Sequence, residues 1–274
     1  MKIRVRILGC GSSGGVPRVG AGWGACDPRN SRNRRRRCSI LVERIGSNGT
    51  TSALVDTSPD LREQLLTADV RRLDAILYTH DHADHSHGID DVRPLVIAMR
   101  QRIPAYLDAA THEILVARFS YCFRASPGSG YPPILEERRF VAGAAVELEG
   151  PGGALSALPF RLIHGNSDAL GLRFGSLLYA PDVSQIPEES MRHFRGLDVL
   201  IIDALRYAPH PTHFSLDEAL ALIDAVRPRR AVLTNLHTDL DYDTLVARLP
   251  AHVEPAFDGL EIEVRVAAET LAWR

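Results

Sequence analysis

The stretch THDHADHSHG, residues 79–88, places four histidines within eight positions and sets two aspartates between them. The whole chain of 274 residues has only 11 histidines. A short apolar segment, Leu73–Tyr78, runs directly into this stretch and is predicted to be a buried strand. Ligands in α/β folds bind at the C-terminal ends of strands. The stretch therefore predicts a metal site at a strand end.

The spacing within the stretch suits two ions. Neutral imidazole is a preferred ligand of Zn²⁺, Mn²⁺ and Fe²⁺, and carboxylate suits the harder of these ions. His80 and His82 are one residue apart, so both rings can hold one ion. Asp84 and His85 can reach a second ion about 3.5–4 Å away, as two-metal hydrolases require. One short loop cannot complete two coordination shells, so further ligands must come from distant segments.

Three later residues are candidates for those ligands. His164, Asp182 and His237 each follow an apolar segment that is predicted to be a strand. Asp182 is the residue that we expect to bridge the two ions. Taken alone, each of the three is more simply interpreted as a cap or a surface residue, and the histidine stretch is what makes them candidates.

Strands and helices alternate in each half of the chain, which predicts a layered α/β protein with two similar halves. One helix is expected to begin at Pro59 after an N-cap at Ser58. Another is expected over Leu216–Val226, behind a capping box made by Ser215 and Glu218. We expect one domain over residues 1–274, with a possible insertion around 107–150 that shapes a pocket.

The bulk properties exclude some classes of function. The formal net charge of −2 provides no strong attraction to nucleic acid or to a membrane surface. No apolar run approaches the roughly 18–20 residues of a membrane span. The opening MKIRVRILGCG lacks the apolar core of an export signal, and the four cysteines are scattered. We therefore expect free thiols and a cytoplasmic location.

Thr79–His85 matches the His-x-His-x-Asp-His signature of the metallo-β-lactamase superfamily. The order His164, Asp182, His237 matches the later motifs of that superfamily, so the chain resembles it over nearly its whole length. The resemblance implies a four-layer αβ/βα sandwich with two divalent metal ions, Zn²⁺ or Mn²⁺, at one edge of the two sheets. It also implies hydrolysis by a metal-bridging hydroxide, with Asp84 as both ligand and orienting group.

Narrower features resemble the phosphodiesterase branch of the superfamily, which includes tRNase Z and the phosphoribosyl 1,2-cyclic phosphate phosphodiesterases. The opening ILGCGSSGGVPRVG, residues 7–20, is similar to the Gly/Ser-rich loop of this branch. The segments YTHDHADHSHGIDDVRPL, residues 78–95, and FDGLEIEV, residues 257–264, look most like the cyclic phosphate enzymes. This resemblance implies cleavage of a small cyclic phosphate or a nucleotide-like phosphodiester.

The same branch has a histidine that is not a metal ligand at the position of His213, before the capped helix. An imidazole that titrates near pH 7 suits protonation of a leaving alkoxide, so His213 is the expected general acid. His210 is a competitor that we rank lower, and a capping or surface role is the alternative for His213.

Four residues are candidates for binding phosphate. Ser12 and Ser13 belong to a glycine-rich turn whose backbone N–H groups can bind phosphate oxygens. Arg37 ends the run Arg34–Arg37, and Arg93 follows the metal stretch; arginine binds phosphate through two hydrogen bonds at once. A tight turn and a solvated basic loop are the alternative interpretations.

The chain departs from the cyclic phosphate enzymes in two places. Those enzymes have a Cys-x-Cys-x-x-Cys cluster for a structural zinc ion, whereas this chain has Ala21, Trp23 and Cys26, so we expect no such ion. Their closing ligand in Leu-Thr-His is replaced here by Asn235. We assign the ligand to His237, because an amide is a poor substitute for imidazole, but Asn235 remains an alternative for that position.

Other functions on the same site are a tRNase Z-like RNA phosphodiesterase, a thioesterase or other ester hydrolase, and a nucleotide-binding protein without catalysis. The first is disfavoured because the sequence shows no long Gly/Lys-rich arm and no basic excess. We expect a small-molecule phosphodiester as the partner, no membrane and no nucleic acid, and a homodimer if the chain associates.

Overall fold

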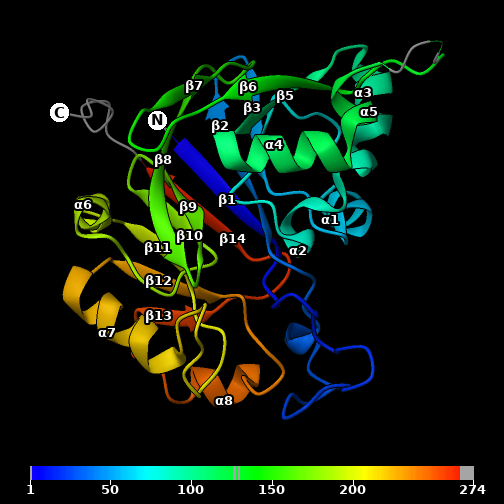
Figure 1. Cartoon of the computed structure of the whole chain (residues 1–274). Coiled ribbons are helices and arrows are strands. Elements are labelled where there is room, and N and C mark those ends of the chain that lie inside the picture. Colours follow the sequence, from blue (N-terminus) through cyan, green and yellow to red (C-terminus); the bar gives the residue numbers. More distant parts are fainter. Residues whose placement is uncertain (1, 126–127, 129, 266–274) are drawn as a thin grey trace.

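The computed structural model describes residues 2–125, 128 and 130–265, and two seven-stranded sheets form its centre (Figure 1). The first sheet has the order β14-β1-β2-β3-β4-β5-β6. Pairing is antiparallel from β14 to β3 and parallel from β3 to β6. The strands are β1 (Lys2–Gly9), β2 (Ser39–Gly46), β3 (Gly49–Val55), β4 (Ala75–Leu77), β5 (Ile103–Leu107), β6 (Leu135–Arg139) and β14 (Glu261–Arg265).

The second sheet repeats this plan, with the order β13-β12-β11-β10-β9-β8-β7. Pairing is antiparallel from β7 to β10 and parallel from β10 to β13. The strands are β7 (Val146–Leu148), β8 (Leu155–His164), β9 (Ser167–Phe174), β10 (Leu177–Ala180), β11 (Val199–Asp203), β12 (Arg230–Thr234) and β13 (Val253–Pro255).

The core between the sheets follows from the alternation of apolar residues along their strands. Ile3, Val5 and Ile7 on β1 have no exposed surface, and they share one apolar cluster with Leu172 and Phe174 on β9. Side chains on alternate positions of a strand point to the same face, so each sheet presents one apolar face to the other. The four cysteines are buried free thiols, as predicted.

Helices cover the outer face of each sheet, each over an apolar cluster of its own (Figure 1). Helices on the first sheet include α1 (Leu61–Thr67), α2 (Ala83–Ser86), η2 (Ile89–Val92), α3 (Arg93–Met99), α4 (Ala109–Arg118) and α5 (Ser120–Phe123). Those on the second are α6 (Glu188–Met191), η3 (Arg192–Phe194), α7 (Leu216–Val226) and α8 (Tyr242–Val246); η1 (Ser31–Asn33) lies in the loop after β1. The four-layer αβ/βα sandwich is therefore confirmed.

The two sheets bring their strand ends to one edge. Strands β10, β11 and β12 are parallel, so the segments that follow Ala180, Asp203 and Thr234 leave the second sheet on the same side. His164 ends β8, which runs in the same direction because two antiparallel pairings separate β8 from β10. The histidine stretch after β4 meets these ends across the sandwich.

One helix differs from the prediction at its start. Helix α1 begins at Leu61 with Asp60 as N-cap, two residues later than expected. Ser58 accepts from Asp60 N through its hydroxyl and donates to Gln64 Oε1 at 2.9 Å, so it holds the turn before the helix. Leu66 on this helix is 61% exposed.

Residues 107–150 contribute to both sheets. The segment forms α4 and α5 on the outer face of the first sheet, adds β6 at that sheet's edge, and then supplies β7 at the edge of the second. It is thus built into the sandwich by strand pairing, while its expected role as an insertion that shapes a pocket stays a prediction.

Candidate metal centre

The histidine stretch gathers its rings around a tight turn into α2. The ring centroids of His80 and His82 lie 4.5 Å apart, and those of His80 and His85 lie 4.4 Å apart. Ser86 Oγ donates to the carbonyl oxygens of Asp81 and His82, which holds the turn in place. The rings of His82 and His85 thus both lie beside the ring of His80.

Asp56, which the sequence analysis did not select, orients part of the cluster from the end of β3. This buried carboxylate accepts hydrogen bonds from Thr79 N and Thr79 Oγ1, both at 2.8 Å. Its Oδ2 also lies 2.8 Å from His85 Nδ1. Because Nδ1 is committed to Asp56, Nε2 of His85 is left for the centre. The only hint in the sequence is that Asp56 follows a strand, in VDTSPD.

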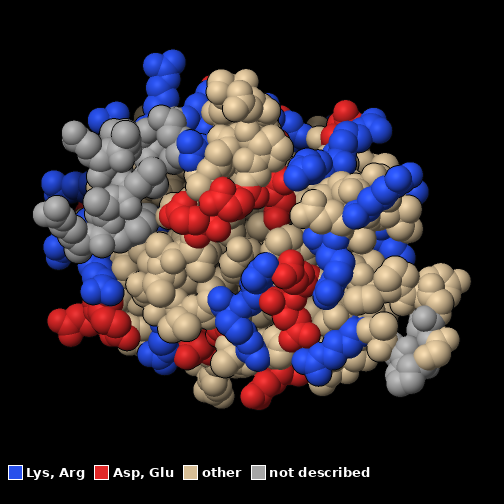
Figure 2. All heavy atoms as spheres, turned by 90° about the horizontal axis from the view of Figure 1, so that it is seen from above, with Lys and Arg blue, Asp and Glu red and all other residues tan. Residues whose placement is uncertain are grey.

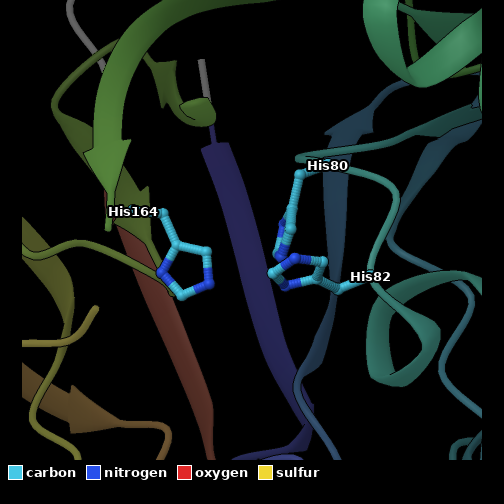
Figure 3. Close-up of side chains that lie close together, drawn as sticks. All are labelled: His80, His82 and His164. Atoms are coloured by element: carbon cyan, nitrogen blue, oxygen red, sulfur yellow. The ribbon is translucent and has the colours of Figure 1, made fainter. Parts of the chain in front are cut away.

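His164 and Asp182 reach the cluster from the second sheet. The His164 ring lies 5.0 Å from that of His82 and 5.3 Å from that of His80, and Figure 3 shows the three rings pointing toward one another from opposite sheets. His164 Nδ1 lies 2.7 Å from the carbonyl oxygen of Thr212, which leaves Nε2 for the centre. Asp182 Oδ1 lies 3.1 Å from His85 Nε2.

Asp182 has contacts with both sides of the cluster. Its Oδ2 lies 4.0 Å from His80 Nε2 and 3.7 Å from His164 Nε2. Asp84 Oδ2 lies 3.5 Å from His85 Nε2. A carboxylate between two groups of imidazoles is the arrangement expected of a residue that bridges two cations.

The chemistry of these groups fits a divalent metal ion. Among the candidate ligands, three buried atoms make no hydrogen bond: His80 Nε2, His85 Nε2 and Asp182 Oδ1. Unpaired buried polar atoms are costly, and all three are metal-ligand atoms. Burial, with the neighbouring imidazole of His85, holds the pKa of His80 well below its ordinary value, so His80 is neutral, as a ligand must be. Ligand atoms close enough to share an ion fall into three groups: His80, His82 and His164; His80, His85 and Asp182; His164, Asp182 and His213.

His213 lies against the cluster and is held by a second buried carboxylate. Its Nδ1 lies 2.8 Å from Asp203 Oδ2 and 3.8 Å from Asp182 Oδ2. Burial alone would lower the pKa of His213, but the carboxylates of Asp203, Asp182 and Asp84 together raise this pKa above its ordinary value. Asp203 ends β11 and was not selected from the sequence. The His210 ring lies beside that of His213, with centroids 5.2 Å apart.

The structure does not bring His237 into the cluster, which corrects its place in the expected ligand set. His237 Nε2 lies 2.6 Å from Arg18 Nη1, and His237 Nδ1 lies 3.3 Å from Asp239 Oδ1. The chain turns at Asn235, whose φ is +61°, before it reaches His237. Asn235 is buried, with Nδ2 3.1 Å from His213 Nδ1 and 3.2 Å from the carbonyl oxygen of Pro181.

The four candidate phosphate-binding residues have different surroundings in the structure. Ser12 is buried, and its hydroxyl makes no hydrogen bond, whereas Ser13 is exposed. Arg37 is paired with Asp60, with Nη2 2.8 Å from Oδ1. Arg93 is paired with Asp90 and lies over the ring of Tyr121. Both guanidinium groups are thus occupied by carboxylates, and phosphate binding by these four residues stays a prediction.

Comparison with known proteins identifies the family. Residues 51–235 match the family model described as "Beta-lactamase superfamily domain". A solved structure titled "Crystal Structure of a New Diphosphatase from the PhnP Family" is 37% identical, with a TM-score of 0.86 over 96% of this chain and 98% of that one. The chain belongs to the metallo-β-lactamase superfamily.

Two further relatives bear on how far this likeness extends. Zn²⁺-bound PqqB from Methylobacterium extorquens has a TM-score of 0.76 over 95% of this chain and 100% of that one, but at 18% identity it shows the fold alone. An octanoyltransferase from Porphyromonas gingivalis (strain ATCC BAA-308 / W83) is 31% identical over 262 residues, 94% of this chain. The chain spans about half, 51%, of that protein. The name octanoyltransferase therefore belongs to a protein about twice as long as the matched part.

Family membership and the geometry of the centre together make this metallo-β-lactamase superfamily protein a metal-dependent hydrolase. The described part of the chain has no helix with the length and apolar character needed to cross a bilayer.

Proposed function

We propose that the protein is a phosphodiesterase that cleaves a small phosphodiester, either a cyclic phosphate such as a phosphoribosyl cyclic phosphate or a nucleotide-like molecule. The observation that carries this proposal is the hydrogen-bonded pair of His213 and Asp203, 2.8 Å apart, beside a cluster of metal-ligand atoms. The relative at 37% identity is titled a diphosphatase, which supports chemistry at phosphorus.

We further propose that the centre holds two divalent ions, Zn²⁺ or Mn²⁺. His80, His82 and His164 would hold one ion, Asp84 and His85 the other, and Asp182 would bridge them. When bound, the ions supply Lewis acidity, lower the pKa of a water molecule toward about 7 and neutralise phosphate charge.

The protein's own residues would supply proton transfer and orientation. Asp203 accepts from His213 Nδ1–H, so it holds the ring in one orientation and favours its protonated form. A protonated His213 can donate a proton from Nε2 to the leaving oxygen. Asp84, 3.5 Å from His85 Nε2, would be both ligand and orienting group.

The charge distribution supports a small substrate. The face in Figure 2 carries basic and acidic side chains interspersed, with neutral residues between them, and the net charge is −2. An extended polyanion such as RNA needs a basic surface. A cytoplasmic location and a homodimer, if the chain associates, remain predictions from the sequence.

The test is turnover of bis-p-nitrophenyl phosphate by metal-loaded protein, compared with turnover of a thioester. We expect diester cleavage, and we expect His213→Ala to reduce kcat by about 10²–10⁴-fold, the usual contribution of a general acid. His252→Ala, a change at an exposed histidine, is the matched control and should leave kcat unchanged. Preferred cleavage of the thioester, or equal kcat in His213→Ala and the wild type, would contradict the proposal.

A further inference from the structure

The two halves of the metal centre have unequal sets of ligands. The first half has three imidazoles, His80, His82 and His164, whose ligand atoms all lie within 4.8 Å of one another. Besides His80, which also belongs to the first half, the second half has one imidazole of its own, His85, and the carboxylate of Asp84, with 3.5 Å between Nε2 and Oδ2. Asp182 is shared between the halves, so it does not change the difference in the number of ligands between them.

The family resemblance places the ligand that would complete the second half at Asn235, which is an amide. Asn235 follows β12 at the edge where the other ligands gather, and its side chain is buried beside His213. Its Nδ2 lies within hydrogen-bond distance of the Pro181 carbonyl oxygen and of His213 Nδ1. An amide has no charge and no imidazole nitrogen, so it is a weak ligand for Zn²⁺ or Mn²⁺.

The nearby histidines do not compensate for this amide. His237 Nε2 lies 2.6 Å from a nitrogen of Arg18, so the ring is occupied by a cation, and it belongs to none of the three ligand groups. His213 comes close through Nδ1, the atom that is hydrogen-bonded to Asp203 Oδ2. Among the residues that the structure describes, no other His, Cys, Asp or Glu joins the three ligand groups.

We propose that the two halves bind divalent metal ions with unequal affinity: the triad His80, His82 and His164 binds tightly, and the half of Asp84 and His85 binds weakly because Asn235 replaces an imidazole. This inference rests on the metal centre in the proposed function. A supporting hydrogen bond to a ligand is worth about 10–100-fold in metal affinity, so a missing ligand should cost about 100-fold or more. The occupancy of the second half then depends on the concentration of free metal.

The test is a titration of chelator-treated protein with Mn²⁺, followed by calorimetry and by electron paramagnetic resonance. We expect two binding steps with dissociation constants about 100-fold apart, and the signal of a coupled Mn²⁺ pair only after the second step. Two equal steps, within about threefold, would overturn the proposal.

Variants at position 235 test whether Asn235 causes the weak binding of the second metal ion. Asn235→His should tighten the second step by about tenfold or more, and its backbone is compatible because histidine tolerates a positive φ. Asn235→Asp keeps the shape of the side chain and adds a negative charge, so it should also tighten the second binding step. If Asn235→His does not fold, Asn235→Asp tests whether Asn235 causes the weak step. His237→Ala is the matched control and should change both constants by less than about twofold.

If neither Asn235 variant tightens the second step, or if His237→Ala abolishes it, the assignment is wrong. The titration contains no substrate. Unequal binding without diester cleavage would therefore refute the proposed function alone, and diester cleavage with equal binding would refute this inference alone.

Discussion

Asp56 shows how one side chain can organise a metal centre without touching the metal. Its φ of +63° is a conformation that aspartate tolerates better than most residues, and it turns the carboxylate under Thr79 and His85. The two oxygens accept three hydrogen bonds from the segment that carries the ligands. Burial raises the pKa of Asp56, while these donors, His85 first, act in the opposite direction.

We predict that Asp56→Asn weakens metal binding by about 10–100-fold, because the amide nitrogen cannot accept from His85 or Thr79. The measurement is a metal titration of chelator-treated protein. Asp258→Asn changes a half-buried aspartate that accepts backbone hydrogen bonds away from the cluster, and this variant should bind metal like the wild type. Equal weakening in the two variants would show a general effect on the fold.

Asp258 also makes stability depend on pH. Burial raises its pKa from 3.8 to about 7, against the opposing hydrogen bonds from Arg36 and Cys10. Between these two values the folded state retains a proton that the unfolded state has lost, so stability falls as pH rises from about 4 to about 7. The limiting slope is about 1.4 kcal/mol per pH unit.

Asp258→Asn should remove that dependence. In urea unfolding at several pH values, the free energy of unfolding of the variant should rise relative to the wild type as pH goes from 4.5 to 7.5. A constant difference across this range would show that Asp258 ionises at its ordinary pKa in the folded protein.

At the scale of elements, the loop between β1 and β2 is held by a buried arginine. Arg35 has 2% relative exposure; it donates from Nη2 to the Leu240 carbonyl oxygen at 2.7 Å and from Nη1 to that of His237 at 3.3 Å. It thereby links this loop to the loop after β12. The same loop carries Arg18, whose guanidinium lies against the His237 ring.

We predict that Arg35→Ala lowers the free energy of unfolding by about 2–4 kcal/mol, because carbonyl oxygens lose their donors and a cavity remains. Urea unfolding measures this change. Arg34→Ala changes a neighbouring exposed arginine that lies over the Trp23 ring, and should cost less than about 1 kcal/mol. Similar losses in the two variants would argue against a role for Arg35 in linking the loops.

The elements differ in how well the sequence predicted them. Helix α7 was predicted to the residue, because Ser215 and Glu218 do form a capping box. The start of α1 was missed by two residues because Ser58 is used to hold a turn. Both Ser58 and Asp60 have cap chemistry, but the Asp60 side chain makes no cap hydrogen bond and its carboxylate accepts from Arg37 instead.

At the scale of the whole molecule, the metal centre joins the two sheets. The histidine stretch follows β4 of the first sheet, whereas His164 and Asp182 follow β8 and β10 of the second. Bound ions should therefore stabilise the sandwich as a unit. The apolar cluster between the sheets contains none of the candidate ligands.

We predict that removing metal with a chelator destabilises the protein by about 3 kcal/mol, relative to protein in free metal at 100 times the dissociation constant. The sheet content should remain, because the core between the sheets is intact. Thermal unfolding with and without chelator measures the first effect, and far-UV circular dichroism the second. Loss of the β-sheet signal on chelation would mean that the metal is required for folding.

The sequence by itself determined the α/β sandwich, the histidine stretch and the distal pair His164 and Asp182. Apolar periodicity along strands is local information, and metal ligands at strand ends form a recognisable pattern. The tertiary structure decided what depends on contacts between distant segments: that Asp56 and Asp203 hold the histidines, and that His237 faces Arg18 while Asn235 lies beside His213. His164 and His237 have the same ligand chemistry and differ in which residues surround their rings. Those surroundings come from distant segments of the chain, so the sequence alone does not show them.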